Sequence, residues 1–156
     1  MQFEHIQNKY TNARNQETLK KVTIYTDGTA NGMTVVSASA AAVVKPYDVA
    51  TYCAGQPDNS EVLLRFNYVR AVRLPANLTG SRVTAGTAAT AQTDFDVTVN
   101  GSSIGTIRFA AAGSVATFVS FAQVDLAAND QLRLIAPASQ DATLADIAFS
   151  FAGTQL

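Results

Sequence analysis

Hydrophobic and polar residues alternate in the second half of the chain, in short runs that turn-forming residues separate. In residues 93–99, Phe and Val side chains fall on one face of an extended chain, and the side chains between them are polar. A period of two predicts a half-buried β-strand. Asn100 and Gly101 follow directly, and both accept the positive φ that a tight hairpin turn requires. The pattern therefore predicts a hairpin whose second strand runs through residues 104–109.

The same alternation predicts further strands on both sides of this hairpin. The strand candidates are residues 21–26, 33–44, 49–54, 61–74, 81–92, 114–121, 124–126, 132–135 and 147–151. In the longest of them Arg70 falls on the apolar side, which indicates either a β-bulge or a buried pair with a carboxylate. Residues 81–92 have little apolar mass and suit an edge strand or a surface crossing. Residues 55–60 are the clearest loop.

This organisation predicts an all-β fold, an antiparallel β-sandwich of jelly-roll-like type, over residues 22–156. We expect about eight to ten of these candidates to form short strands, a number and spacing typical of a sandwich. A chain of 156 residues is long enough for one such domain with its own hydrophobic core. Residues 1–21 lack the alternation, so we expect them to form a short N-terminal arm.

The arm differs from the rest of the chain in composition. It carries four basic residues against two acidic ones, and its apolar residues are scattered. One hypothesis is a solvated tail, and the other is a peg that inserts into a neighbouring subunit. In the second case Phe3, Ile6 and Tyr10 are the candidate anchoring side chains. The arm has no apolar block of the kind that signal peptides carry, so we expect synthesis in the cytoplasm without export.

Charged residues are sparse along the whole chain. They make up only 15% of it, and the formal net charge is −1. Nucleic acids and anionic membranes bind clustered Lys and Arg, so neither is an expected partner. The most apolar run, residues 35–44, is too short to cross a bilayer. A neutral surface rich in Ala, Ser and Thr instead suits packing against other subunits.

Few residues are candidates for chemistry. The chain has one Cys, Cys53, and one His, His5, so it can form neither an intrachain disulfide nor a multi-histidine metal site. Asp94 and Asp96 project from one strand face about 7 Å apart, a spacing that suits glycoside hydrolysis or a Ca²⁺ site. The alternative is a solvated strand face, which we favour because the chain has no Trp to line a sugar cleft. We predict no catalytic residue, no metal site, no cofactor and no enzymatic activity.

Three tyrosines, Tyr47, Tyr52 and Tyr68, are candidates for a sugar-binding platform, because aromatic rings combine an apolar face with a polar tip. Alternation within a strand explains Tyr68 as a packed residue, and the other two lie beside a break at Pro46. Ordinary packing or subunit contact is therefore the interpretation we prefer.

Three segments of the chain resemble a β-sandwich module that recurs in tailed-phage and prophage structural proteins. The segments are LPANLTGS at residues 74–81, FDVTVNGSSIGTIRF at 95–109 and LRLIAPASQDATLADI at 132–147, followed by Ala152-Gly153-Thr154. The resemblance covers roughly residues 60–154. The motif residues that fall at turns or strand ends are Asn100, Gly101, Asn129, Asp130 and Pro137. Asp141 and Asp146 are placed to accept hydrogen bonds from backbone N–H groups near a turn.

The resemblance implies a non-enzymatic virion protein, a component of a tail fibre or other appendage that takes part in host attachment. The partners it implies are other virion proteins, further copies of the chain with a trimer favoured, and a host surface glycan. The location it implies is the virion. Two alternatives stay open: a capsid decoration or head-fibre protein that stabilises the shell, and a glycan-binding receptor module.

Overall fold

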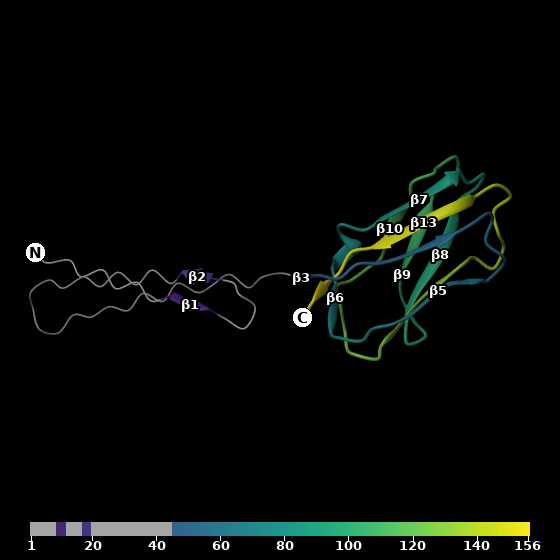
Figure 1. Cartoon of the computed structure of the whole chain (residues 1–156). Helices are drawn as coiled ribbons and strands as arrows, with labels where there is room; N and C mark the ends of the chain where they lie inside the picture. The colour runs from purple at the N-terminus through teal and green to yellow at the C-terminus, as the bar shows by residue number, and fades with distance from the viewer. Residues whose placement is uncertain (1–8, 12–16, 20–44) are drawn as a thin grey trace, which may run out of the picture. The chain divides into compact units, whose positions relative to one another are not determined.

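The structure, a computed structural model, describes residues 9–11, 17–19 and 45–156 (Figure 1). The chain divides into two compact units, Met1–Val43 and Val44–Leu156. All of the predicted sandwich residues that the structure describes belong to the second unit.

In the first unit, strand β1 (Lys9–Thr11) pairs antiparallel with β2 (Glu17–Leu19). Both strands fall within the predicted arm. The strands predicted at residues 21–26 and 33–44 lie outside the described residues, and so does the predicted start of the sandwich at residue 22.

The second unit is built from strands β3 to β14. The first six are β3 (Lys45–Pro46), β4 (Val49–Cys53), β5 (Val62–Asn67), β6 (Val72–Leu74), β7 (Arg82–Thr87) and β8 (Thr93–Val99). The others are β9 (Ser102–Phe109), β10 (Thr117–Val119), β11 (Val124–Leu126), β12 (Gln131–Ile135), β13 (Ala145–Phe151) and β14 (Thr154–Gln155). One short 3-10 turn, η1 (Ala76–Leu78), follows β6.

These strands form three antiparallel sheets, which confirms the prediction of an all-β antiparallel sandwich. A five-stranded sheet has the order β10-β9-β8-β12-β5, and a three-stranded sheet has the order β4-β13-β7. A four-stranded sheet has the order β11-β6-β14-β3. The five-stranded and three-stranded sheets face each other across the core, where the ring of Phe95 on β8 lies 5.6 Å from that of Phe149 on β13.

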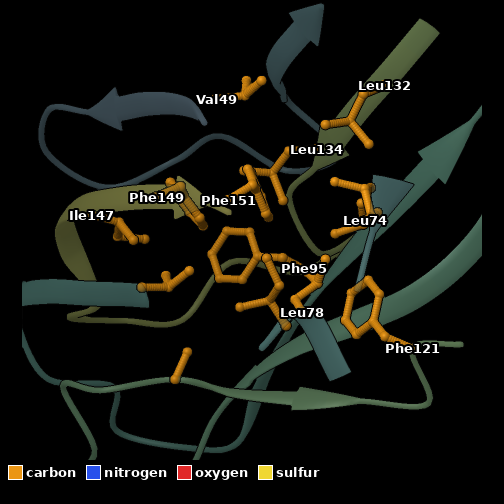
Figure 2. Close-up of a cluster of buried hydrophobic side chains, with 14 of the residues drawn as sticks. Val49, Leu74, Leu78, Phe95, Phe121, Leu132, Leu134, Ile147, Phe149 and Phe151 are labelled. Carbon is orange, nitrogen blue, oxygen red and sulfur yellow. The ribbon is translucent and has the colours of Figure 1, made fainter. Parts of the chain in front are cut away.

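The core consists of the apolar residues that alternate along the central strands. Phe95, Ile107, Phe109, Ile147 and Phe149 are completely buried. Figure 2 shows the side chains of Phe95 and Phe149 directed toward each other, with residues from several strands around them. Alternation in β8, β9 and β13 therefore predicts the buried face correctly, because successive side chains of a strand point to opposite sides of the sheet.

The β8–β9 hairpin has the predicted two-residue turn. Asn100 has φ of 51° and Gly101 has φ of 86°. Two successive positive φ values are typical of the two-residue hairpin turn whose backbone twist matches that of the flanking strands. The turn is also held from outside the hairpin, because the Asn100 side chain donates to Asp130 at 2.8 Å and accepts from the Gln131 N–H at 2.9 Å. The two predicted turns, Asn100–Gly101 and Asn129–Asp130, thus lie together.

A β-bulge in β9 brings Gly105 under an aromatic ring. The register with β8 shifts between Val97 and Thr98, so that Ile104 is the extra residue. Gly105 has φ of 153°, and a Cβ at this position would lie only 2.6 Å from ring atoms of Phe121. Glycine is required here because the backbone and the ring approach closely.

The prediction of one long strand over residues 61–74 is wrong. Strand β5 ends at Asn67 in the five-stranded sheet, and β6 begins at Val72 in the four-stranded sheet. Arg70 lies in the connection between them and is exposed, so neither a bulge nor a buried ion pair is present at this position. The side-chain alternation restarts because the chain leaves one sheet and enters another.

Strand β7 lies at the edge of its sheet, as its composition predicts. The edge is not left open. The Ala85 N–H donates to the Ser114 carbonyl at 2.8 Å, and the Ala116 N–H donates to the Val83 carbonyl at 3.1 Å. The β9–β10 connection therefore covers the free backbone groups of β7, which protects the edge from pairing with another chain.

Candidate functional site

Loops from both facing sheets meet at one end of the sandwich, which we call the loop end. It consists of the β4–β5, β7–β8, β9–β10 and β12–β13 connections, residues 54–61, 88–92, 110–116 and 136–144. The chain enters the domain at the other end, where β3 pairs with β14. Figure 1 shows β3, β6 and the C-terminus together at that entry end.

Asp141 ties two of these loops together. Its carboxylate accepts hydrogen bonds from the N–H groups of Thr90 at 3.0 Å and Ala91 at 2.9 Å in the β7–β8 loop. It also accepts from the N–H groups of Thr143 at 2.9 Å and Leu144 at 3.0 Å in its own loop. The prediction that Asp141 satisfies backbone donors near a turn is confirmed.

The charge of Asp141 is strongly favoured in the folded chain. Partial removal from water raises the pKa of its carboxyl. The hydrogen bonds from Thr90, Thr143 and Ala91 together lower the pKa by more, so the net pKa lies well below the usual range. Multiple donors to a carboxylate have this effect because they stabilise only the ionised form. The two loops are therefore joined by a permanently charged acceptor at neutral pH.

Asp146 ties a third loop to the start of β13. Its Oδ1 accepts from the Gly55 N–H at 2.8 Å and from the Tyr52 hydroxyl at 3.1 Å, and its own N–H donates to the Gly55 carbonyl at 2.9 Å. Asp146 has φ of 57°, a conformation that Asp tolerates better than most residues. Its predicted role as an acceptor for backbone donors is confirmed as well.

Further hydrogen bonds connect the β4–β5 loop to the β12–β13 loop. Asn59 accepts from the Gln140 N–H at 2.7 Å, and the Ser60 N–H donates to the Pro137 carbonyl at 2.9 Å. In the β9–β10 loop, the Ala112 N–H donates to the Ala89 carbonyl at 2.7 Å. All four loops are thus connected to one another, which makes the loop end a preformed surface.

The loop end offers neutral hydrogen-bonding groups to solvent. None of its four loops contains Lys or Arg, and its exposed acidic residues are Asp58 and Glu61. Its exposed amide and hydroxyl side chains are Gln56, Asn59, Ser60, Thr90, Gln92, Ser114, Ser139 and Gln140. Such a surface can donate and accept hydrogen bonds, and it suits a saccharide or a polar protein surface.

The Asp94 and Asp96 pair does not form a joint site. Asp94 makes a two-point ion pair with Arg108, with distances of 2.8 Å and 2.7 Å, and these hydrogen bonds lower the pKa of Asp94. Asp96 accepts instead from the Ser103 hydroxyl. In the part of the chain that the structure describes, no three His, Cys, Asp or Glu side chains gather as a metal site.

The three tyrosines do not form a common platform. Tyr68 is buried beside Phe66 and Tyr47, with ring centroids 5.1 Å and 5.8 Å away, so its face is part of the core. Tyr52 alone presents its ring to solvent, with 61% of its surface exposed. Packing, the preferred interpretation, holds for Tyr68.

Cys53 is a half-buried thiol on β4. Burial raises the pKa of Cys53, and the carboxylates of Glu61, Asp146 and Asp58 raise it further. A thiol in this environment is a poor nucleophile. His5, the single histidine of the chain, lies outside the described residues.

The candidate anchoring residues stay predictions. Phe3 and Ile6 lie outside the described residues, and Tyr10 lies on strand β1. Within the described ranges, no helix is long and apolar enough to cross a membrane.

Sequence reasoning missed the partners that make the loop end a unit. Asp141 was identified, but its neighbours Thr90 and Ala91 lie about fifty residues earlier and carry no sequence signal for this contact. A local signal does exist for Thr143, because an Asp side chain in a turn commonly accepts a hydrogen bond from the backbone N–H two residues later.

Comparisons of the chain with protein-family models, curated proteins and solved structures found no match. The resemblance to phage structural proteins is carried by the three sequence segments alone.

Proposed function

We propose that this chain is a non-enzymatic structural protein of a phage virion, a component of a tail fibre or other appendage that contacts the host. The sequence resemblance over residues 60–154 supports the setting. One observation carries the contact itself: loops from both sheets, tied by Asp141 and Asp146, lie opposite the end where the chain enters the domain. The entry end is then available for attachment, and the tied loops face outward.

Tied loops are well suited to binding. Binding residues commonly lie on loops that a rigid scaffold supports. When such loops are mobile, the entropy lost as they become ordered weakens binding. Here the hydrogen bonds of Asp141 to Thr90 and Ala91 order the loops before any partner arrives. The amide and hydroxyl groups around them are the groups that bind a host surface glycan.

The other partners in the proposal are virion proteins and further copies of the chain. Residues 1–43 precede the domain and would hold it in the virion, with Phe3, Ile6 and Tyr10 as candidate anchors. A trimer with converging entry ends is the arrangement we favour, because cyclic closure directs every loop end the same way.

Competition for host cells tests the proposed contact. Ser139→Arg places a bulky charge on the exposed loop end without removing a tie, and Ala50→Arg places the same charge on the exposed face of the edge strand β4, opposite Ser150. The purified wild-type chain and Ala50→Arg should block adsorption of the parent phage, and Ser139→Arg should not. Equal blocking by all three chains would exclude the loop end as the contact.

Labelling of intact virions tests the location. Electron microscopy should place the label at the tail or at another appendage, with a copy number that matches the few appendages of a particle. A label spread over the capsid lattice, with a copy number that matches the lattice, would contradict the proposal and indicate a capsid decoration protein.

A further inference from the structure

Two arginines face each other on the outer side of the five-stranded sheet. Arg65 on β5 and Arg133 on β12 are direct partners in the antiparallel register. Side chains at such positions lie about 5 Å apart at Cβ, and like charges there destabilise the sheet. Arg65 is exposed and Arg133 is half-buried. Within residues 45–156, neither forms an ion pair with a carboxylate.

Two other strand arginines are treated differently by this fold. Arg108 on β9 lies directly opposite Asp94, and Arg73 on β6 lies directly opposite Asp125. Both make two-point ion pairs, with the Arg73 nitrogens 2.6 Å from Asp125. Arg65 and Arg133 differ from these two arginines, because no carboxylate lies directly opposite either of them in the sheet.

An unpartnered hydroxyl lies in the same row. Thr98 on β8 is the register partner of Arg133, and its neighbours Val97 and Val99 belong to the core side of the strand. The Thr98 side chain therefore points to the outer face with the arginines. It is only 4% exposed, and its Oγ1 has no hydrogen-bond partner. A buried hydroxyl without a partner destabilises the fold, so it indicates a missing acceptor.

Hydrogen bonds to neighbouring amide side chains orient Arg133. The Arg133 Nε donates to Gln131 at 2.6 Å, and the Gln131 amide donates to Asn67 at 2.9 Å, which leaves the terminal nitrogens of Arg133 for another acceptor. Asp96 lies one row away on β8 and accepts from the Ser103 hydroxyl. Arg65, Arg133 and Thr98 are thus neighbours across three strands, and the Thr98 hydroxyl has no acceptor among the described residues.

We propose that Arg65, Arg133 and Thr98 form a binding site for an oxyanion, the carboxylate or phosphate group of an acidic ligand. Two guanidinium groups can hold such a group from opposite sides, and each can do so through two N–H donors. The anion removes the repulsion between the arginines and gives the Thr98 hydroxyl an acceptor. This site lies on a sheet face and is separate from the loop end.

The ligand class follows from the proposed function, on which this step alone rests. An acidic surface glycan carries carboxylate or phosphate groups along a neutral polymer. Such a polymer can place an anion on the arginine row and hydroxyl groups on polar surfaces of the same domain. The oxyanion site itself does not depend on the virion assignment.

Titration of the full chain with inorganic phosphate at low ionic strength tests the site, with binding followed by calorimetry. Arg65→Gln and Arg133→Gln should each weaken binding by about tenfold, which corresponds to the loss of one charge-assisted contact. Thr98→Val, which keeps the shape and removes the hydroxyl, should weaken it severalfold. Arg82→Gln on β7, an exposed arginine of the other sheet, is the matched control and should change nothing.

Stability measurements on the same variants separate binding from structure. Without phosphate, Arg65→Gln and Thr98→Val should be at least as stable as the wild-type chain, because each removes an unfavourable feature. At the same phosphate concentration, the wild-type chain and Arg82→Gln should gain more thermal stability than the three site variants, because those bind phosphate more weakly. An absence of saturable phosphate binding, or an equal loss in Arg82→Gln, would overturn the proposal.

Three further ligands identify the source of the anion. Glucuronate and a sugar phosphate should both bind, and glucose should not. The tighter binder of the two shows whether the site prefers a carboxylate or a phosphate group. If Arg65→Gln instead dissociates an oligomer of the chain and leaves phosphate binding unchanged, the row is a subunit contact and the proposal is wrong. Phosphate binding together with failed competition for host cells would refute the proposed function and leave the site intact.

Discussion

Single residues decide how well the loop end is held. Asp141 and Asp146 are small side chains that each accept hydrogen bonds from more than one donor, and an ionised carboxylate has room for several. Asp141 receives backbone N–H groups from two loops, and Asp146 receives Gly55 and Tyr52. The effect of these residues on stability and reactivity can be measured directly.

Asp141→Ala should lower the free energy of unfolding by roughly 1 to 3 kcal/mol, because several backbone donors lose their acceptor. Asp141→Asn keeps one acceptor oxygen and should lose less. Urea denaturation at neutral pH measures both. A loss below about 0.5 kcal/mol in the Ala variant would show that the tie contributes nothing beyond a surface contact.

The contribution of Asp141 should also depend on pH. Its pKa is lower in the folded chain than in the unfolded chain, so its stabilising effect is complete above the unfolded value of about 3.9 and disappears as the pH falls toward the folded value. The difference in stability between the wild-type chain and Asp141→Asn should therefore be constant at neutral pH and shrink below about pH 4. A difference that grows on acidification would contradict this sign.

Cys53 should react slowly with alkylating reagents. Burial raises the pKa of its thiol, followed by the effects of the nearby carboxylates of Glu61 and Asp146, and only the thiolate reacts. The midpoint of the pH–rate profile should lie higher in the folded chain than in the same chain unfolded in denaturant, which serves as the control. Equal profiles would mean that the thiol is freely solvated.

At the scale of elements, the fold depends on devices that interrupt regular strands. The bulge in β9 places Gly105 against Phe121, and the β9–β10 connection covers the edge of β7. Bulges of this kind re-aim side chains and increase strand twist. They also make single glycine positions intolerant of a side chain.

Gly105→Ala should destabilise the domain by about 3 kcal/mol, because it combines a strained φ with a clash against the Phe121 ring. Gly101→Ala is the control, since its φ is also positive but nothing lies within 4 Å of the added Cβ. It should lose about 1 kcal/mol. In a Phe121→Ala background the cost of Gly105→Ala should fall to a similar value, and equal costs in both backgrounds would rule out the clash.

At the scale of the whole molecule, the second unit contains a complete core of its own. The buried hydrophobic residues that the structure describes, from Val49 to Phe151, all belong to Val44–Leu156. Figure 2 shows side chains of β4, β6, β8, β12 and β13 in one cluster. A domain that buries such a core can fold without further segments.

A chain of residues 44–156 should therefore fold alone. Its thermal midpoint should lie within about 5 °C of that of the full chain at the same oligomeric state, because the buried core from Val49 to Phe151 is kept whole. Calorimetry measures this, with the full chain as the reference. A fall of more than about 10 °C would show that the preceding residues stabilise the sandwich.

Much of the fold could be predicted from the sequence. The alternation in residues 93–99 and 147–151 identified the buried side chains, and Asn100–Gly101 identified a turn. These signals are local, because the direction of a side chain in a strand depends on its parity and a tight turn depends on the φ of one or two residues. The same locality explains the error over residues 61–74, where apolar parity continues by chance across a change of sheet.

The amino-acid sequence by itself determined the class of the fold, the faces of its central strands and the acceptor role of Asp141 and Asp146. Only the tertiary structure decided which strands became neighbours. That choice brought Thr90 to Asp141 and set Arg65 beside Arg133 and Thr98. The physical reason is that strand order depends on burying both sheet faces of the whole domain at once, so contacts between distant strands leave no periodic signal in either strand.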